Sequence, residues 1–330
     1  MTLAPPPRGD AVALARTLIA VDSRNPSLAR GVSGEGDCAR MLAEILGGWG
    51  FRVALVESLP GRPSMVARIG RAGGRTLMFN GHLDTVGVEG MTHAPFDPLI
   101  ADGNIHGRGS CDMKGGVAAM CAAAVHAADA DIAGEIVIAA VIDEEWQSAG
   151  TASLLARGVR ADAAIVTEPT RLAIGSAHRG FAWAVVTVHG VAAHGSRYDV
   201  GVDAITMAGL LLAELDEYQR TVLPKRTHLL LGRGSFHAAQ ISGGVGLSTY
   251  AESCRVELER RTLPGDTRES FADELRAACA RVAARDPRFT ADVMVTFVQA
   301  PNDVALDEPI VRTLAGAVEQ VEGAPAAIEG

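Results

Sequence analysis

Four short motifs in the chain carry residues that could do metal-assisted chemistry. The first, Gly81-His82-Leu83-Asp84, follows an apolar stretch that ends at Asn80. In an extended segment the side chains of residues i and i+2 fall on one side, so Asp84 can orient the imidazole of His82 for metal binding. A histidine after a strand is more often a hydrogen-bonded structural residue, so this motif alone leaves both interpretations open.

The second motif is a glycine-rich loop, Gly107 to Gly116, which leads into a helix and contains Asp112. Its glycines allow close backbone approach, and Asp112 lies near the positive end of that helix. On its own, Asp112 is more simply interpreted as a capping or turn residue. A phosphate-binding loop is a further alternative, but the Walker spacing is absent.

Carboxylates follow two further apolar stretches. Glu144 and Glu145 come after Ile136 to Ile142, and Glu168 comes after Ala163 to Val166. Two adjacent carboxylates beyond a buried strand repel each other unless a cation or a shared proton neutralises them. Such a pair can divide the work, because one carboxylate can bind a metal ion while the other takes a proton from the metal-activated water. A solvated acidic turn is the alternative.

Taken together, the four motifs offer one imidazole and three carboxylates as metal ligands. These are His82, Asp112, Glu145 and Glu168. This set suits zinc, with cobalt or manganese as alternatives, better than a metal that prefers thiolates.

Short apolar stretches predict a helix-flanked, mostly parallel sheet of an α/β protein. The predicted strands are Arg52 to Val56, Met65 to Ile69, Thr76 to Asn80, Ile136 to Ile142 and Ala163 to Val166. The predicted helices are Asp10 to Ile19, Asp37 to Leu46 and the crossover helix Gly115 to Ala128. In parallel sheets the ligand site lies beyond the carboxyl ends of the strands, which is where these motifs are expected.

From Phe181 the pattern changes to strand, helix, strand, strand, helix, strand, which is typical of a small ferredoxin-like α+β domain. A further helix at Asp307 to Val321 indicates that this domain is inserted into the larger one. We therefore predict a catalytic metal-binding domain at residues 1–178, an inserted domain at 179–298, and a return segment of the catalytic domain at 299–330.

Composition excludes several classes of protein. A formal net charge of -9 disfavours nucleic-acid binding. Five cysteines without Cys-x-x-Cys spacing indicate neither a disulfide framework nor a thiolate zinc site, so a cytoplasmic location is expected. No leader-like start and no apolar run of about 18 residues occur, so no membrane span is expected.

In these motifs and their order, the chain resembles the family of acetylornithine deacetylase, succinyl-diaminopimelate desuccinylase, aminoacylase and glutamate carboxypeptidase over nearly its whole length. The resemblance implies a zinc-exopeptidase-like catalytic domain that holds two divalent metal ions. It implies that Asp112 bridges the ions, with His82 and Glu168 on the first and Glu145 on the second. It also implies that Glu144 is the general base and that Asp84 supports His82.

The inserted domain resembles the lid and dimerisation domain of the same family in the segments Gly190 to Ser196 and Gly201 to Ile205. The resemblance implies a homodimer in which His194 reaches the partner subunit's active site and helps to hold the oxyanion. A matching segment, Glu259 to Gly265, makes Arg261 the candidate for binding a substrate carboxylate. Without the resemblance, an ordinary loop histidine and a surface ion pair are the simpler interpretations.

Members of that family continue beyond the point that matches Gly330, into a segment with the histidine ligand of the second metal ion. We therefore expect a chain truncated at its C-terminus, with an incomplete second site. The expected activity is hydrolysis of the amide bond of an N-acyl amino acid by a metal-activated water, as in a deacetylase or desuccinylase. The alternatives are a metallocarboxypeptidase or dipeptidase acting on a short peptide, and a truncated, catalytically inactive metal-binding or dimerising protein.

Overall fold

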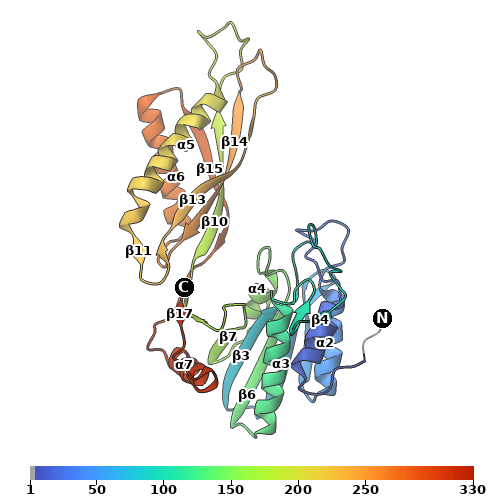
Figure 1. The fold of residues 1–330 in the computed structure, drawn as a ribbon. Coiled ribbons are helices and arrows are strands. Elements are labelled where there is room, and N and C mark those ends of the chain that lie inside the picture. Colours follow the sequence, from blue (N-terminus) through green and yellow to red (C-terminus); the bar gives the residue numbers. More distant parts are fainter. Residues whose placement is uncertain (1–3) are drawn as a thin grey trace. The chain divides into compact units, whose positions relative to one another are not determined.

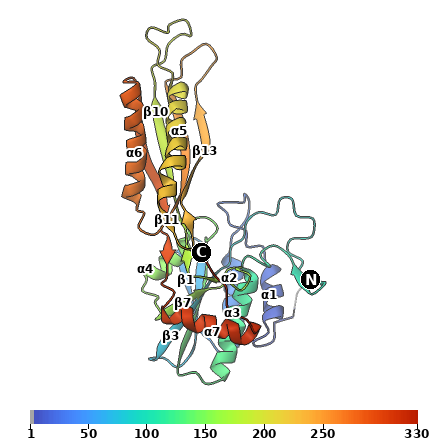
Figure 2. The same ribbon diagram turned by 60° about the vertical axis from the view of Figure 1, so that its left-hand side comes forward.

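The structure, a computed structural model, describes residues 4–330 of the chain (Figures 1 and 2). These residues form two compact units, one running to Arg171 and the other covering Leu172–Gly330. Each unit has its own sheet and its own hydrophobic core. None of the helices in the described part of the chain combines the length and the apolarity that a bilayer crossing needs.

The first unit is built on a five-stranded sheet with the order β1-β2-β6-β3-β7. The strands are β1 (Arg52–Leu59), β2 (Arg62–Gly70), β3 (Arg75–His82), β6 (Gly134–Val141) and β7 (Ala163–Val166). The helices are α1 (Ala11–Ile19), α2 (Gly36–Gly48), α3 (Lys114–Asp129) and α4 (Ala149–Ala156), and a separate hairpin joins β4 (Leu99–Ala101) to β5 (Asn104–His106). All the strands and helices predicted for this part of the chain are confirmed, to within a few residues at their ends.

Strand β6 shows how the sequence builds two apolar layers. Its side chains alternate between the faces of the sheet, as a strand requires. Ile136, Ile138 and Ala140 pack with α1, α2 and α3 on one face. Val137 and Ala139 pack on the other face, in a smaller cluster that includes Leu154 of α4. The sheet is therefore covered by helices on both faces, as its continuous apolar strands predicted.

The sheet is mixed, which differs from the mostly parallel sheet predicted. β3 pairs in parallel with β6 and β7, but β1 pairs antiparallel with β2, and β2 pairs antiparallel with β6. The first of these antiparallel pairings follows from the short connection between β1 and β2, where Gly61 has a positive φ of 72°. So tight a turn can only join antiparallel neighbours.

The second unit contains a four-stranded antiparallel sheet with the order β13-β14-β10-β15. Its elements are β10 (Gly180–His189), α5 (Ala204–Thr221), β13 (Ser235–Gly243), β14 (Ser253–Thr262), α6 (Arg268–Arg285) and β15 (Thr290–Gln299). Figures 1 and 2 show α5 and α6 side by side on one face of this sheet. Their apolar residues form one core with the inward residues of β10, such as Ala184 and Val186. The order strand, helix, strand, strand, helix, strand is as predicted.

The rest of the second unit consists of short elements and one helix. They are β8 (Ile174–Gly175), β9 (Ala177–His178), the 3-10 helix η1 (Leu223–Lys225), β11 (Thr227–His228), β12 (Gly232–Arg233), β16 (Asn302–Asp303), α7 (Pro309–Glu322) and β17 (Ile328–Glu329). β16 pairs with β9 and β17 pairs with β8, so the segment 299–330 contacts the chain just before residue 179. The division into catalytic, inserted and return segments stays a prediction.

Candidate metal centre

Three mutually parallel strands bring the predicted motifs to one edge of the first sheet. His82 is the last residue of β3 and lies opposite Val141, the last residue of β6. Glu144 and Glu145 follow β6 after Ile142 and Asp143, and Glu168 follows β7 after Thr167. Because β3, β6 and β7 run in the same direction, the segments that follow them leave the same edge of the sheet.

The imidazole of His82 is buried and its hydrogen bonds define its tautomer. Nδ1 lies 2.8 Å from the backbone carbonyl oxygen of Asp84, and because that oxygen can only accept, Nδ1 carries the proton in the neutral ring. Nε2 then has its lone pair free. It lies 3.0 Å from Oδ1 of Asp112, 3.7 Å from Oε1 of Glu168 and 3.8 Å from Oε2 of Glu144. A neutral imidazole oriented in this way is a typical metal ligand.

Three of the four predicted ligands meet within the reach of one cation. Ligand atoms of His82, Asp112 and Glu168 all lie within 4.8 Å of one another. The side chains of Asp112 and Glu168 are 56% and 34% exposed, so the cluster opens to solvent on one side. Glu145, the fourth predicted ligand, is not part of this group.

Gly116 explains how Asp112 and Glu168 come so close together. It lies in the first turn of α3, just after the loop that carries Asp112. A Cβ atom at this position would lie 2.1 Å from the carbonyl oxygen of Thr167, the residue before Glu168. Only glycine therefore lets the start of α3 approach the end of β7 at this distance.

Asp84 contributes differently from the prediction. The ring of His82 is held by the backbone carbonyl of Asp84, while its nearest carboxylate oxygen is 3.6 Å from Nδ1. The fully buried carboxylate instead accepts hydrogen bonds from the backbone N–H groups of Glu144 at 3.1 Å and Glu145 at 3.0 Å, and from Nδ2 of Asn25 at 2.8 Å. Its side chain thus fixes the acidic turn after β6.

The charges around His82 hold it protonated when no cation competes. Burial by itself lowers the pKa of His82, but the hydrogen bond to Asp112 and the charges of Asp84, Glu168 and Glu144 outweigh burial and raise it to about 9. The same hydrogen bond lowers the pKa of Asp112.

The pKa values of the three glutamates of the site are raised, unlike that of Asp112. Burial raises the pKa of Glu145 and of Glu168 to about 7, and the neighbouring carboxylates add to this rise although His82 opposes it. Burial and neighbouring carboxylates also raise the pKa of Glu144. Crowded carboxylates of this kind are relieved by a cation placed among them.

The donor set fits a divalent metal ion. One imidazole nitrogen and two carboxylate oxygens converge, and Glu144 stands beside them. Nitrogen and oxygen ligands in this ratio suit zinc, and cobalt or manganese accept the same ligands.

His194 lies in the second unit, in the exposed loop between β10 and α5. Its Nδ1 lies 2.9 Å from Oγ of Ser196 and accepts a hydrogen bond of 3.3 Å from the backbone N–H of Ser196. Because a backbone N–H can only donate, Nδ1 is the acceptor and the neutral ring carries its proton on Nε2. His194 is thus arranged to donate a hydrogen bond, as an oxyanion would require.

Arg261 also lies in the second unit, near the end of β14. Its Nε donates to Oε1 of Glu259 at 2.8 Å, and its guanidinium lies 5.3 Å from the centre of the Phe181 ring. The side chain is 45% exposed. Its partner is therefore an intramolecular carboxylate, and the assignment of Arg261 and His194 to the active site stays a prediction.

Four buried polar residues behind the acidic turn were not identified from the sequence. They are Asn25, Glu35, Arg62 and Asp143. Asp143 could have been noticed because it adjoins the glutamate pair, and Arg62 because it is a charged residue at the start of a mostly buried strand. Nothing in the sequence indicates that these residues meet.

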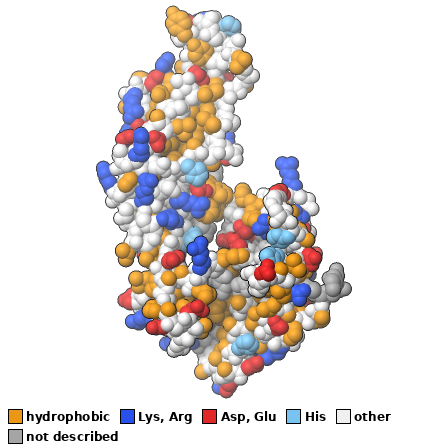
Figure 3. Space-filling model, viewed as in Figure 1, with side chains coloured by type: hydrophobic (Ala, Val, Ile, Leu, Met, Phe, Trp, Pro, Cys, Tyr) orange, Lys and Arg blue, Asp and Glu red, His pale blue; other side chains and the backbone are white. Residues whose placement is uncertain are grey.

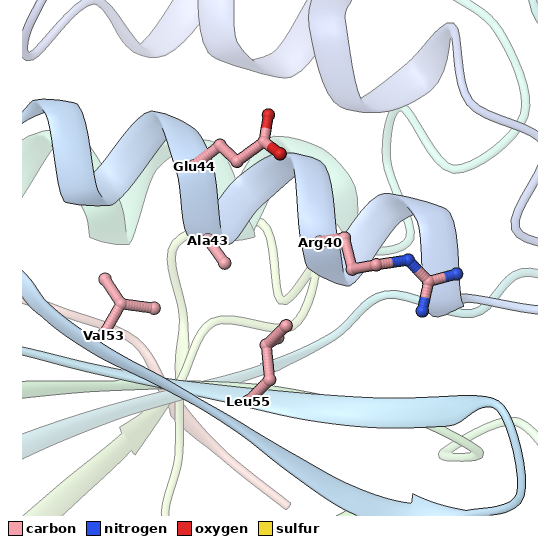
Figure 4. Close-up of a pocket in the computed structure, with 5 residues that line it drawn as sticks. All are labelled: Arg40, Ala43, Glu44, Val53 and Leu55. Carbon is pink, nitrogen blue, oxygen red and sulfur yellow. The ribbon is translucent and has the colours of Figure 1, made fainter.

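An open hollow of about 490 Å³ elsewhere in the first unit lies away from this chemistry. Figure 4 shows it between α2, which contributes Arg40, Ala43 and Glu44, and the edge strand β1, which contributes Val53 and Leu55. None of the predicted site residues lines it.

Comparison with known proteins gives matches along most of the chain. The model of the family described as Peptidase family M20/M25/M40 matches residues 78–329. A succinyl-diaminopimelate desuccinylase of Paracoccus denitrificans is 32% identical over 88% of this chain and 78% of its own length. An acetylornithine deacetylase of Myxococcus xanthus is 30% identical over 74% of this chain, and an N-formyl-4-amino-5-aminomethyl-2-methylpyrimidine deformylase of Bacillus subtilis is 28% identical over 83%. The chain spans 65% of the length of the deacetylase and 68% of that of the deformylase.

Solved structures share the fold. Aminopeptidase PepT of Bacillus cereus superposes with a TM-score of 0.77 at 21% identity, covering 97% of this chain and 83% of its own. The YXEP protein of Bacillus subtilis, described as a dinuclear metal-binding peptidase of the M20 family, superposes with a TM-score of 0.70 at 15% identity, covering 97% of this chain and 82% of its own.

Proposed function

The chain belongs to the peptidase family M20/M25/M40, and from this premise we propose that it is a metal-dependent hydrolase that cleaves the amide bond of an N-acyl amino acid. The observation that carries the proposal is the convergence of Nε2 of His82 with the carboxylates of Asp112 and Glu168 within 4.8 Å. The named relatives that act by removing a succinyl, acetyl or formyl group support a deacylase within this family.

Two divalent ions, with zinc the expected metal, are part of the proposal. His82, Asp112 and Glu168 would hold the first ion, and Asp112 with Glu145 would hold the second. When bound, such ions acidify water and polarise a carbonyl group. The YXEP protein, described as dinuclear, supports the number of ions. The pKa of Glu145 is raised to about 7, and a cation bound beside this carboxylate would lower it again and keep the group ionised.

Glu144 is the proposed general base. Its carboxylate lies 3.8 Å from Nε2 of His82, at the edge of the ligand cluster, and its side chain is 46% exposed, so water and substrate can reach it. Burial raises its pKa, which makes it a better proton acceptor than an ordinary glutamate. It takes a proton from the water that attacks the amide carbon. It then gives that proton to the amide nitrogen as the C–N bond breaks, which releases a carboxylic acid and an amine.

Two residues of the second unit also take part in the proposed chemistry. In the proposed homodimer, His194 reaches the partner subunit's active site and donates a hydrogen bond from Nε2 to the oxyanion, in agreement with the acceptor role of its Nδ1. Arg261 binds the carboxylate of the amino acid, for which its guanidinium must exchange Glu259 for the substrate.

A peptidase acting on a short peptide is the second candidate. It is favoured by the structural match to an aminopeptidase along 97% of this chain. The two candidates share every residue of the proposed chemistry and differ in what lies on the acyl side of the amide bond.

A substrate panel with matched variants tests the proposal. Acetyl, succinyl and formyl amino acids are compared with dipeptides in the presence of zinc or cobalt. Glu144→Gln should abolish turnover and leave the bound metal nearly unchanged, whereas Glu44→Gln, an exposed glutamate on α2, should leave both unchanged. If only the dipeptides are cleaved, the protein is a peptidase and the proposed deacylase function is wrong. Metal binding without turnover of any substrate replaces the enzyme by a non-catalytic metal-binding protein.

We further propose a homodimer formed through the second unit. β13 is an edge strand, and its residues from His237 to Gly243 are exposed, including Ile241 at 53%. Ile205 and Leu210 of α5 are also exposed, at 44% and 41%. Figure 3 shows hydrophobic side chains at the surface of this unit. An unpaired edge strand with apolar side chains is suited to pairing with a second copy.

Light scattering after size-exclusion chromatography tests the dimer. Ile241→Lys on β13 should give a monomer, because a lysine on an edge strand opposes pairing. Met294→Lys is the matched control, since Met294 is 56% exposed on β15, the opposite edge of the same sheet. If both variants and the parent elute as monomers, the dimer is wrong.

A cytoplasmic location also remains part of the proposal. The five cysteines are all free in the described part of the chain, and Cys38, Cys121 and Cys254 are buried. Free buried thiols suit a reducing compartment.

A further inference from the structure

The acidic turn after β6 is held in an uncommon backbone conformation. Asp143 has a φ of +64°, in the left-handed region that residues other than glycine rarely adopt. The residue is 3% exposed. Its carbonyl oxygen accepts from the backbone N–H of Gln147 at 3.1 Å and of Ser148 at 2.6 Å, so the chain reverses sharply at this point. Such a conformation persists only where the surroundings impose it.

A buried guanidinium lies behind the turn. Arg62 donates to both carboxylate oxygens of Glu35, from Nε at 2.7 Å and from Nη2 at 2.6 Å, and Nη2 also donates to Oδ1 of Asp143 at 3.1 Å. The backbone N–H of Asp143 donates to Glu35 at 3.1 Å. Glu35 is completely buried and the side chain of Arg62 is 11% exposed. Asp143 is therefore held through both its side chain and its backbone.

Asn25 joins this ion pair to the metal site. Its Nδ2 donates to Oδ2 of Asp84 at 2.8 Å and to Oδ1 of Asp143 at 3.2 Å. Oδ1 of Asn25 accepts a hydrogen bond from the backbone N–H of Ser27, and the backbone N–H of Asn25 donates to the carbonyl oxygen of Thr85. Asn25 is completely buried. The neutral amide of Asn25 thus donates to two carboxylates, those of Asp84 and Asp143, which would otherwise repel each other.

The network ends on the proposed base. Asp84, held by Asn25, accepts the backbone N–H groups of Glu144 and Glu145. The directions of these two side chains therefore depend on contacts that begin at Glu35 and Arg62. A buried ion pair adds little net stability by itself, so its main effect here is on geometry.

We propose that Asn25 and Arg62 are positioning residues that hold the Asp143–Glu145 turn so that the carboxylate of Glu144 stands beside His82. The inference rests on the proposed function only for the role of Glu144 as base. Asn25 and Arg62 make no hydrogen bond to His82, Asp112 or Glu168, and the network reaches His82 only through Asp84.

Asn25→Asp in the full chain is the most direct test, because it keeps the shape of the side chain and replaces the donor by a third carboxylate. Asn104→Asp, an exposed asparagine of the same unit, makes the same charge change without these contacts. Hydrogen exchange measured by NMR reports the backbone N–H groups of Glu144 and Glu145. A hydrogen bond to a charged group is strong enough that its loss should speed their exchange by about tenfold or more.

The expected result for Asn25→Asp is faster exchange at Glu144 and Glu145 with unchanged protection in β6, whereas Asn104→Asp changes neither. With zinc and the best substrate of the panel, kcat should fall by about 100-fold with KM unchanged, because a misplaced base affects the chemical step. Arg62→Met should act in the same direction, and Arg62→Lys should recover part of the loss.

If Asn25→Asp does not fold, Asn25→Ala removes the donor without adding a charge, and the same amides are measured. Unchanged exchange at Glu144 and Glu145 in either variant would overturn the proposal. So would an equal loss of protection in β6, because Asn25 would then serve the stability of the whole unit. The exchange measurement needs no turnover, so a fully active Glu144→Gln variant would remove Glu144 as the general base and leave the positioning result standing.

Discussion

Raising the pH from 7 to 8 should strengthen zinc binding by a predictable factor. In the metal-free protein His82 has a pKa of about 9, so at pH 7 a metal ion must displace its proton before Nε2 can bind. Each pH unit below the pKa weakens the apparent affinity by about tenfold. Glu168 and Glu145, with pKa values of about 7, are half ionised at pH 7 and add up to about twofold each. The expected gain from pH 7 to 8 is therefore between about tenfold and thirtyfold.

The assay is competition for zinc between the protein and a coloured chelator of known pH dependence, at constant ionic strength. Calorimetry in two buffers of different ionisation enthalpy counts the protons released. At pH 7 about one proton should come from His82 and about half a proton from Glu168. His82→Gln should lose most of the affinity and the part of its pH dependence that comes from His82, whereas His237→Gln, an exposed histidine of the second unit, should change neither. Equal affinity at the two pH values, or release of no proton, would show that zinc does not displace a proton from His82.

Three further predictions concern the charge of His82, the close approach of α3 to the end of β7, and the core of the second unit. With chelator present, the free energy of unfolding in urea should fall from pH 6 to pH 9, by about 3 kcal/mol from His82 alone and further from Glu145 and Glu168. The pKa of His82 is raised to about 9 and those of the two glutamates to about 7, so the stability that their protonated forms contribute is lost as the pH rises through these values. A flat profile would contradict this. Gly116→Ala should weaken zinc binding by pushing α3 away from Thr167, and Gly209→Ala, in open space on α5, should not. Leu275→Ala should destabilise the second unit by about 2–5 kcal/mol without changing the zinc affinity.

Much of the metal site could be predicted from the sequence because its residues follow strands. His82, Glu144 and Glu168 come directly after, or at the end of, apolar stretches, and the rule for parallel strands places such residues at one edge. The three strands that matter are parallel, so the prediction holds although the sheet is mixed. The antiparallel pairing of β1 and β2 was missed because the turn at Gly61 was not recognised as a hairpin.

The positioning network could not be predicted because its contacts are not local. The ion pair of Arg62 with Glu35 joins residues 27 apart in the chain, and the hydrogen bond of Asn25 to Asp143 joins residues 118 apart. Spacing rules apply to neighbours on one helix or strand and carry no information on such pairs. The local rule places Asp84 beside His82, but it does not indicate that the carboxylate of Asp84 also accepts from backbone N–H groups 60 and 61 residues further along.

Anomalous diffraction at the zinc edge, from crystals of the full chain grown with zinc, would locate the bound ion. We expect a peak within bonding distance of Nε2 of His82 and of the carboxylates of Asp112 and Glu168. Zinc bound only at other residues, with His82 still hydrogen-bonded to Asp112, would contradict the metal centre and the hydrolase built on it.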